Sequence, residues 1–265
     1  MIDRRQLAAV LVEHLPGQRW FAQGERPFTA ADVEVVTVDG LRGEWPGLVR
    51  VLVSVAGVRW QLVLGLRPPD SREAFFEGKP EALLGTLDTE LGPALAYDAT
   101  IDPELAVILL GVIAPGEEVA RARPLMAEQS NTSVVYDERL ILKLFRRLVE
   151  GPNPDAEVSR ALAGVGFANV AELVAEWRVD GDDCAIVNAF LTSGSDGFSL
   201  ALTSLRDLYD LRGDPREAGG DFGPDARRLG IITAKMHLAL AEAFGTSPAD
   251  PAAWAGDMVA TLDGV

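Results

Sequence analysis

The sequence predicts an α+β protein in which antiparallel strands with accompanying helices occupy most of the chain and helices alone complete it. Three observations predict this class. Runs rich in β-branched residues recur, apolar residues at helical spacing separate some of these runs, and the pattern after Gly197 is helical throughout. A length of 265 residues, 48% of them apolar, is enough for two compact units with buried cores.

Residues 1–115 are predicted to form a first unit, a small antiparallel sheet with helices against it. The first helix ends at Pro16-Gly17, and its apolar positions have helical spacing: Leu7, Val10, Leu11 and Leu15. The strands expected next are Val33–Val38, Leu48–Ala56 and Val58–Leu66. Ala56-Gly57 is short enough to close a hairpin between the last two strands.

The chain after Pro68 is predicted to be irregular as far as the helix that begins at Asp102-Pro103. Asp is a preferred N-cap and Pro a preferred first helical residue, so this helix is expected to run through Leu110. Pro115-Gly116 marks the junction with a second unit.

Residues 116–191 are predicted to form a second sheet around one helix. The expected strands are Pro124–Glu128, Ser133–Tyr136, Arg139–Phe145, Val170–Val179 and Cys184–Leu191. Asn153-Pro154 begins the helix, whose apolar stripe is expected at Val158, Ala161, Leu162 and Val165. Strands, helix, strands is the order of a small nucleotide-binding lobe. Residues 192–265 are predicted as helices over Leu200–Leu211, Pro224–Phe244 and Pro251–Leu262.

The charge and residue composition exclude several kinds of partner. The chain has 24 Lys and Arg residues against 40 Asp and Glu residues, a net charge of −16, so a nucleic acid would be repelled before contact. No apolar run approaches the ~20 residues that span a bilayer. Cys184 is the single cysteine, and His14 and His237 are the two histidines, so neither a disulfide within the chain nor a zinc site is expected. We therefore expect a cytoplasmic protein without a membrane or nucleic-acid partner.

Lys143 is the residue that points most directly to chemistry. It interrupts the apolar strand Leu140–Phe145, where an unpaired ammonium group would be costly to bury. Either the ammonium reaches a carboxylate and an anionic ligand, or its aliphatic stem carries the charge to the edge of the sheet. Glu157, on the next helix, is the expected partner in the first case, as in the lysine and glutamate pair of kinase small lobes. In the second case Glu157 would pair with Arg160.

The other polar and aromatic candidates have simpler interpretations. The polar segment Gln129–Ser133 offers hydroxyls and amides to phosphates without a glycine, and an ordinary hairpin loop is its alternative. His237 is expected to be partly buried and hydrogen-bonded, and Trp20-Phe21 to pack in a core. The remaining carboxylate pairs are expected to be solvated turns: Asp182-Asp183 and Glu117-Glu118.

Several spaced motifs together resemble bacterial maltokinases, a family similar in fold to aminoglycoside phosphotransferases and eukaryotic-like kinases. The motifs that match the family's small lobe are Glu128–Val135, Leu142–Arg147 and Gly151–Glu157. Further matches are Gln18–Ala22, which resembles the family's cap-domain signature, Gly219–Phe222 and Thr233–His237. The resemblance implies a cap domain over residues 1–115, a kinase-like small lobe over 116–191 and the helical start of a large lobe over 192–265.

The resemblance also implies an ATP site. Ser130, Asn131, Thr132 and Ser133 would lie over the phosphates, Lys143 would contact them, and Glu157 would fix the lysine. Asn188 and Phe190 would belong to the hinge, where backbone groups meet the adenine edge. ATP and Mg would be the cofactors, maltose the sugar converted to maltose 1-phosphate, and trehalose synthase an associated protein. Glucosamine kinases resemble maltokinases in these lobes and are the alternative.

The sequence departs from the family pattern in its catalytic segments. Neither the H-G-D-L-H catalytic loop nor the D-F-E metal-binding motif occurs, and Asp221-Phe222-Gly223 precedes a helix instead of following such a loop. We therefore predict no catalytic or metal-binding residue here and no kinase turnover by this chain alone, as in the N-terminal part of a longer kinase. A non-catalytic module of cap and nucleotide lobe, whose exposed apolar surface would favour a homodimer, is the competing interpretation.

Overall fold

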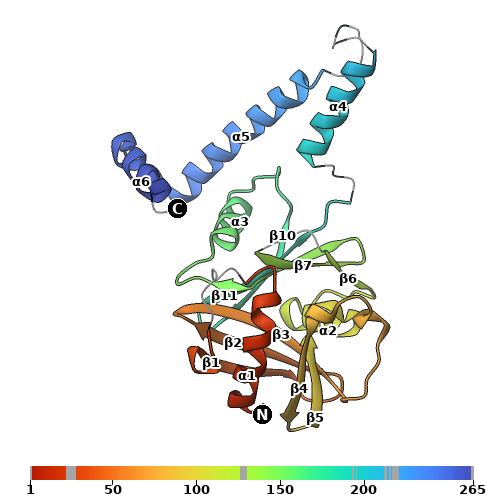
Figure 1. Cartoon of the computed structure of the whole chain (residues 1–265). Helices are drawn as coiled ribbons and strands as arrows, with labels where there is room; N and C mark the ends of the chain where they lie inside the picture. The colour runs from red at the N-terminus through yellow and green to blue at the C-terminus, as the bar shows by residue number, and fades with distance from the viewer. Residues whose placement is uncertain are drawn as a thin grey trace. The chain divides into compact units, whose positions relative to one another are not determined.

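The computed structural model describes residues 2–21, 28–125, 130–192, 194, 196–211, 214, 216 and 221–263. The chain divides into two compact units (Figure 1). The first comprises Met1–Arg160 and Val170–Gly197, and the second comprises Ala161–Asn169 and Phe198–Val265.

The first sheet is antiparallel and lies in the first unit, with the strand order β1-β2-β3-β5-β4. Its strands are β1 (Val33–Arg42), β2 (Gly47–Val55), β3 (Val58–Arg67), β4 (Leu83–Thr89) and β5 (Gly92–Asp98). A short later strand, β9 (Arg147–Leu148), pairs with β3. The predicted hairpin is confirmed: Ala56 and Gly57 have φ values of 49° and 80°, as a two-residue type I′ turn requires.

Strands β4 and β5 correct the expectation of irregular chain after Pro68. Gly85, Gly92 and Pro93 interrupt the β-branched pattern in this segment, and these residue types weaken a strand prediction. The strand forms because β5 pairs with β3 over Leu64–Arg67. The pairing with β3, and not the local sequence, determines that this segment forms strands.

The second sheet, also antiparallel and in the first unit, has the order β10-β11-β8-β7-β6. Its strands are β6 (Ala122–Leu125), β7 (Asn131–Tyr136), β8 (Leu140–Phe145), β10 (Leu173–Val179) and β11 (Asp182–Ala189). The α+β prediction with two antiparallel sheets is therefore confirmed. Strand β7 begins two residues before the predicted Ser133, and residues 126–129 of the preceding segment lie outside the described chain.

Six α-helices occur among the described residues: α1 (Arg4–His14), α2 (Pro103–Ile113), α3 (Pro154–Gly164), α4 (Gly197–Leu211), α5 (Gly223–Phe244) and α6 (Pro251–Asp263). The start predicted for α2 is confirmed, because the Asp102 carboxylate accepts from the amides of Glu104 and Leu105 at 2.9 and 3.2 Å. These bonds satisfy two of the amides that a helix N-terminus leaves unpaired.

The first sheet is covered on both faces, which explains why β2 is buried along nearly its whole length. Leu48 and Leu52 belong to a core shared with α2 and the second sheet, whereas Val49, Val51 and Val53 belong to a core shared with α1. Alternate residues of a strand point to opposite faces, so consecutive apolar residues fill two cores.

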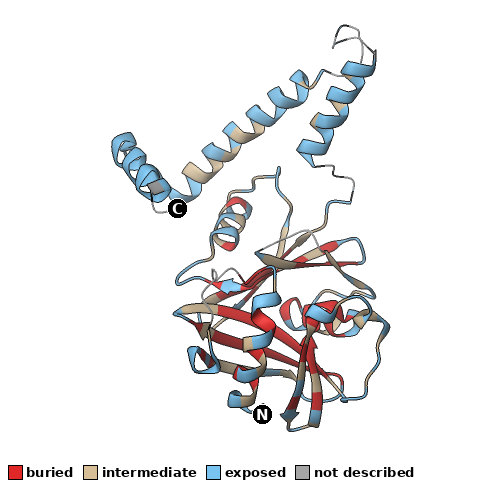
Figure 2. Ribbon diagram, in the orientation of Figure 1, coloured by how far each residue is buried: buried red, intermediate tan, exposed pale blue. Residues whose placement is uncertain are grey.

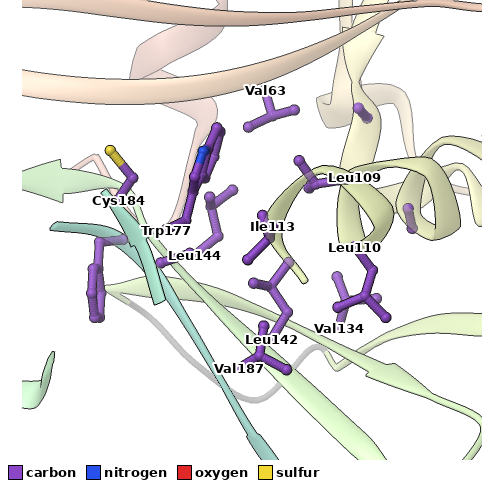
Figure 3. Packing of buried hydrophobic residues seen from close by; sticks show 14 of the residues in the cluster. Val63, Leu109, Leu110, Ile113, Val134, Leu142, Leu144, Trp177, Cys184 and Val187 are labelled. Atoms are coloured by element: carbon purple, nitrogen blue, oxygen red, sulfur yellow. The ribbon is translucent and has the colours of Figure 1, made fainter. Parts of the chain in front are cut away.

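The core between the two sheets draws side chains from both sides of residue 115 (Figure 3). Leu109, Leu110 and Ile113 of α2 lie near Val134 and Leu142 of the second sheet. The division of this part into domains at residues 115 and 191 stays a prediction.

The helices of the second unit bury little. None of the described residues of α4, α5 and α6 is buried (Figure 2), and Phe198, Tyr209 and Leu238 are each more than 70% exposed. His237 is exposed as well, which corrects the expectation of a partly buried histidine. Among the described residues, no helix has the length and apolar character needed to cross a membrane.

Candidate functional site

Lys143 lies in the middle of the second sheet, on β8 between β7 and β11. Ser133 is its neighbour across the β7 pair, and Ile186 is its neighbour across the β11 pair. The Lys143 side chain is 28% exposed, and its Nζ lies 2.7 Å from Oδ2 of Asp155. The ammonium therefore has both a carboxylate partner and access to solvent, which removes most of the cost of placing it in an apolar strand.

The partner of Lys143 is Asp155, which corrects the predicted pair with Glu157. The buried stripe of α3 passes through Ala156, and the predicted member Val158 is 36% exposed. Asp155 and Glu157 are two positions apart and so point about 200° apart around the helix axis. Only one of them can face β8, and the rotation of α3 selects Asp155. The direct hydrogen bonds of Arg160 go to Glu176, and Glu157 acts on the arginine only through its charge, which helps to raise the pKa of Arg160.

The start of α3 is fixed by Asp183, a carboxylate that we expected to lie in a solvated turn. Asp183 is 4% exposed. Its Oδ2 accepts from the amide of Asn153 at 2.8 Å, and its Oδ1 pairs with Arg178 at 3.0 Å and Arg160 at 3.4 Å. Because α3 carries Asp155, this buried carboxylate helps to place the partner of Lys143.

The residues expected over phosphates divide into two groups. Ser130 is exposed, and its Oγ accepts from the Asn131 amide group at 3.2 Å. Asn131 and Thr132 lie in strand β7 and not in a loop, which corrects their predicted place, whereas Ser133 lies in the strand that was predicted to begin there. The Thr132 hydroxyl accepts from Nε of Arg146 at 2.8 Å. Ser133 is 1% exposed, so its side chain is covered by protein.

The two residues expected in a hinge lie at the C-terminal end of β11, Asn188 within the strand and Phe190 directly after it. The amide oxygen of Asn188 is buried and has no hydrogen-bond partner among the described residues. The Phe190 ring lies 5.8 Å from the Arg123 guanidinium carbon. The backbone amides of Ala189 and Phe190 donate to the carbonyl groups of Glu172 and Arg139.

Cys184 adds no nucleophile to this region. Burial raises the pKa of its thiol, and the sulfur accepts from the Arg50 guanidinium at 3.3 Å. A protonated, buried thiol is a weak nucleophile. We therefore treat Cys184 as part of the core between the sheets, where Figure 3 shows it beside Trp177.

The comparison with known families identifies the N-terminal part of the chain. Residues 14–102 match the maltokinase N-terminal cap domain. This stretch includes strands β1 to β5 and ends at Asp102, the N-cap of α2, so the predicted cap region is confirmed over these residues.

Comparisons with individual proteins show distant similarity to glucosamine kinases. The chain is 29% identical to the glucosamine kinase of Streptacidiphilus jiangxiensis over 173 residues, which cover 60% of this chain and 37% of that protein. It is 26% identical to the glucosamine kinase of Mycolicibacterium smegmatis (strain ATCC 700084 / mc(2)155) over 147 residues, 53% of this chain and 36% of that protein. The chain thus matches little more than a third of the length of these relatives.

Solved structures support the fold. A glucosamine kinase in complex with glucosamine, ADP and inorganic phosphate superposes with a TM-score of 0.54 at 23% identity, covering 87% of this chain and 52% of that one. Crystal form A of a glucosamine kinase superposes with a TM-score of 0.54 at 22% identity, covering 97% of this chain and 57% of that one. A cap domain followed by a kinase-like region is therefore the architecture of this chain.

The cap signature Gln18–Ala22 places two aromatic rings in the cap core. Trp20 and Phe21 are 8% and 9% exposed, and their ring centroids lie 6.0 and 4.8 Å from that of Trp60. The prediction that they pack in a core is confirmed. Ala22 and Gly219-Gly220 of the matching motifs lie outside the described residues.

Proposed function

We propose that this chain binds ATP as part of a sugar kinase. The observation that carries the proposal is the Lys143–Asp155 pair, a partly exposed ammonium on the otherwise apolar central strand β8. Such a lysine is suited to contact phosphate oxygens, and a carboxylate on the neighbouring helix keeps it in place. The similarity to glucosamine kinases supports the same class of reaction.

The residues present would bind the nucleotide at its two ends. Lys143, Ser130 and Asn131 would face the phosphates, and magnesium would arrive with ATP and offset part of the phosphate charge. Asn188 and Phe190 would border the purine. Glu157 has no role in holding Lys143 in this proposal.

The acceptor is a sugar hydroxyl, with glucosamine as the first candidate. The relatives of this chain are glucosamine kinases. Maltose, phosphorylated at its anomeric hydroxyl, is the second candidate because the cap region matches the maltokinase family. Transfer to either sugar needs an acceptor base, and the H-G-D-L-H and D-F-E segments do not occur in this sequence. We therefore expect no sugar-dependent ATP consumption by the 265-residue chain.

Calorimetric titration of Mg-ATP into the purified chain tests nucleotide binding. We expect Lys143→Met to weaken ATP affinity about tenfold or more, because one charge-assisted phosphate contact contributes about 1.4 kcal/mol or more. Lys235→Met is the matched control, since it removes the same charge from the exposed side of α5. Absence of ATP binding by the wild-type chain, or an equal loss in the two variants, would contradict the proposal.

A further inference from the structure

Arg146 connects the cap domain to the strand that begins beside the phosphate-facing residues. Its side chain is 1% exposed. One guanidinium nitrogen donates to Asp98, and Nε donates to the Thr132 hydroxyl at 2.8 Å. The guanidinium carbon lies 5.0 Å from the Trp20 ring centroid. The Arg146 carbonyl accepts from the amide of Gln61 at 2.6 Å. Three of these four partners belong to the cap domain.

Asp98 is itself held firmly at the end of β5. Its Oδ1 accepts from the amide and the hydroxyl of Thr100 at 3.0 and 2.7 Å. Its Oδ2 binds Arg146. Both carboxylate oxygens are thus occupied, and the residue is 7% exposed. A buried guanidinium with a fixed carboxylate on one side has one favourable orientation, because its planar nitrogens cannot turn without breaking a charged pair.

The strand geometry sets what Arg146 can reach. In the β7–β8 register Asn131 pairs with Phe145, and Ser133 pairs with Lys143. Arg146 follows Phe145 directly and lies between strands β8 and β9. From there its side chain reaches the Thr132 hydroxyl on the neighbouring strand β7. Thr132 is β-branched and has few side-chain rotamers, so a bond to its hydroxyl also fixes its backbone. The neighbouring residues on that side are Ser130 and Asn131.

We propose that Arg146 is a positioning residue through which the cap domain fixes the phosphate-facing start of β7. This inference rests on the proposed function, because it takes Ser130 and Asn131 to face a nucleoside triphosphate. It gives the cap-signature residue Trp20 a second role beyond core packing, since the ring supports one face of the guanidinium. A substitution of Asp98, which lies in the cap domain and does not face the nucleotide itself, would then alter phosphate binding through Arg146.

Two variants test the proposal from opposite sides of Arg146. Asp98→Asn removes the carboxylate charge on the cap side, and Thr132→Val removes the hydroxyl acceptor while keeping the branched shape. We expect each variant to weaken Mg-ATP affinity about fivefold or more, within the usual range of coupling between sites. Hydrogen exchange of the unliganded protein should become faster at the amides of residues 131–133 and stay unchanged at the central strands β2 and β3.

Asp182→Asn is the matched control, because the pair Arg59–Asp182 also joins the cap to the second sheet but lies at the β10–β11 turn, with contacts of 2.7 and 2.9 Å. We expect it to leave ATP affinity and exchange at residues 131–133 unchanged. Faster exchange throughout the first unit, unchanged ATP affinity in both test variants, or equal effects in the control would overturn the proposal. If the wild-type chain does not bind ATP, the proposed function fails, and exchange at residues 131–133 alone decides whether Arg146 positions β7.

Discussion

Replacing Gln61 with leucine should test how strongly polar contacts between the two sheets stabilise the first unit. Gln61 has no exposed surface. Its amide nitrogen donates to the carbonyls of Phe145 and Cys184, each at 3.0 Å. Its amide oxygen accepts from Nε of Arg50 at 2.8 Å. One side chain of the cap therefore satisfies two carbonyls of the second sheet and one buried guanidinium.

The expected loss follows from the groups that Gln61→Leu leaves unpaired. Each buried polar group that loses its partner costs about 1–3 kcal/mol. Three groups lose the Gln61 side chain as a partner: the carbonyls of Phe145 and Cys184 and the Nε of Arg50. Leucine is close to glutamine in volume and recovers about 1–2 kcal/mol through its apolar surface. The three groups together cost about 3–9 kcal/mol, which leaves a net destabilisation of about 1–8 kcal/mol, and we expect about 3 kcal/mol or more, a large fraction of the 5–15 kcal/mol that stabilises a typical domain.

Urea unfolding at 25 °C, followed by tryptophan fluorescence and far-UV circular dichroism, measures this loss. With a slope of about 2–3 kcal/mol per molar urea, the midpoint should fall by about 1 M or more. Gln18→Leu is the control, since Gln18 also donates to two carbonyl oxygens, of His14 and Glu81, but is partly exposed. A loss below about 1 kcal/mol, or one equal to the Gln18→Leu loss, would refute the argument that buried unpaired groups dominate here.

Three further predictions concern the cap domain. Gly65→Ala should destabilise by about 1–3 kcal/mol in urea unfolding, because its Cβ would lie 2.5 Å from the Tyr97 ring; Gly40→Ala, where a Cβ meets nothing within 4 Å, is the near-neutral control. Asp102→Ala should cost about 2–4 kcal/mol by thermal or urea unfolding, since it removes a helix cap and the acceptor of the buried Tyr97 hydroxyl, while Arg67 keeps its ion pair with Glu104 at 2.9 Å. Burial lowers the pKa of His14 in the folded protein, so the unfolded chain takes up the proton first as the pH drops below about 6.5, and stability should fall by at most about 1.4 kcal/mol per pH unit. A His14→Gln variant compared between pH 7.5 and 5.5 should lack that part of the slope.

Local patterns in the sequence were sufficient for many of the elements. Helices α2 and α3 begin where Asp102-Pro103 and Asn153-Pro154 predict, because caps and proline act within one turn. The two-residue turns at Ala56-Gly57 and Asp137-Glu138 were equally local, and all four residues have positive φ. Strands with long β-branched runs, such as β2, were predicted for the same reason.

Contacts between distant segments decided what the local patterns could not. Strands β4 and β5 exist because β5 pairs with β3. Asp183 reads as a polar turn residue in the sequence, and only the packing of α3 beside β10 and β11 makes it a buried carboxylate with two arginine partners. Two arginines at suitable places, Arg160 and Arg178, are a weak signal that could have indicated such a partner.

The sequence by itself determined the α+β class, the position of Lys143 in an apolar strand and the order of cap, sheet and helices. Only the tertiary structure decided that Asp155 and not Glu157 holds Lys143, and that Arg146 joins Asp98 to Thr132. The reason is physical: periodicity and caps depend on neighbours within a few residues, whereas the rotation of a helix and the pairing of buried charges depend on the whole packed core. The Thr132 hydroxyl and the Asp98 carboxylate lie 14 and 48 residues before Arg146 in the sequence, and both reach its guanidinium group only after that core has formed.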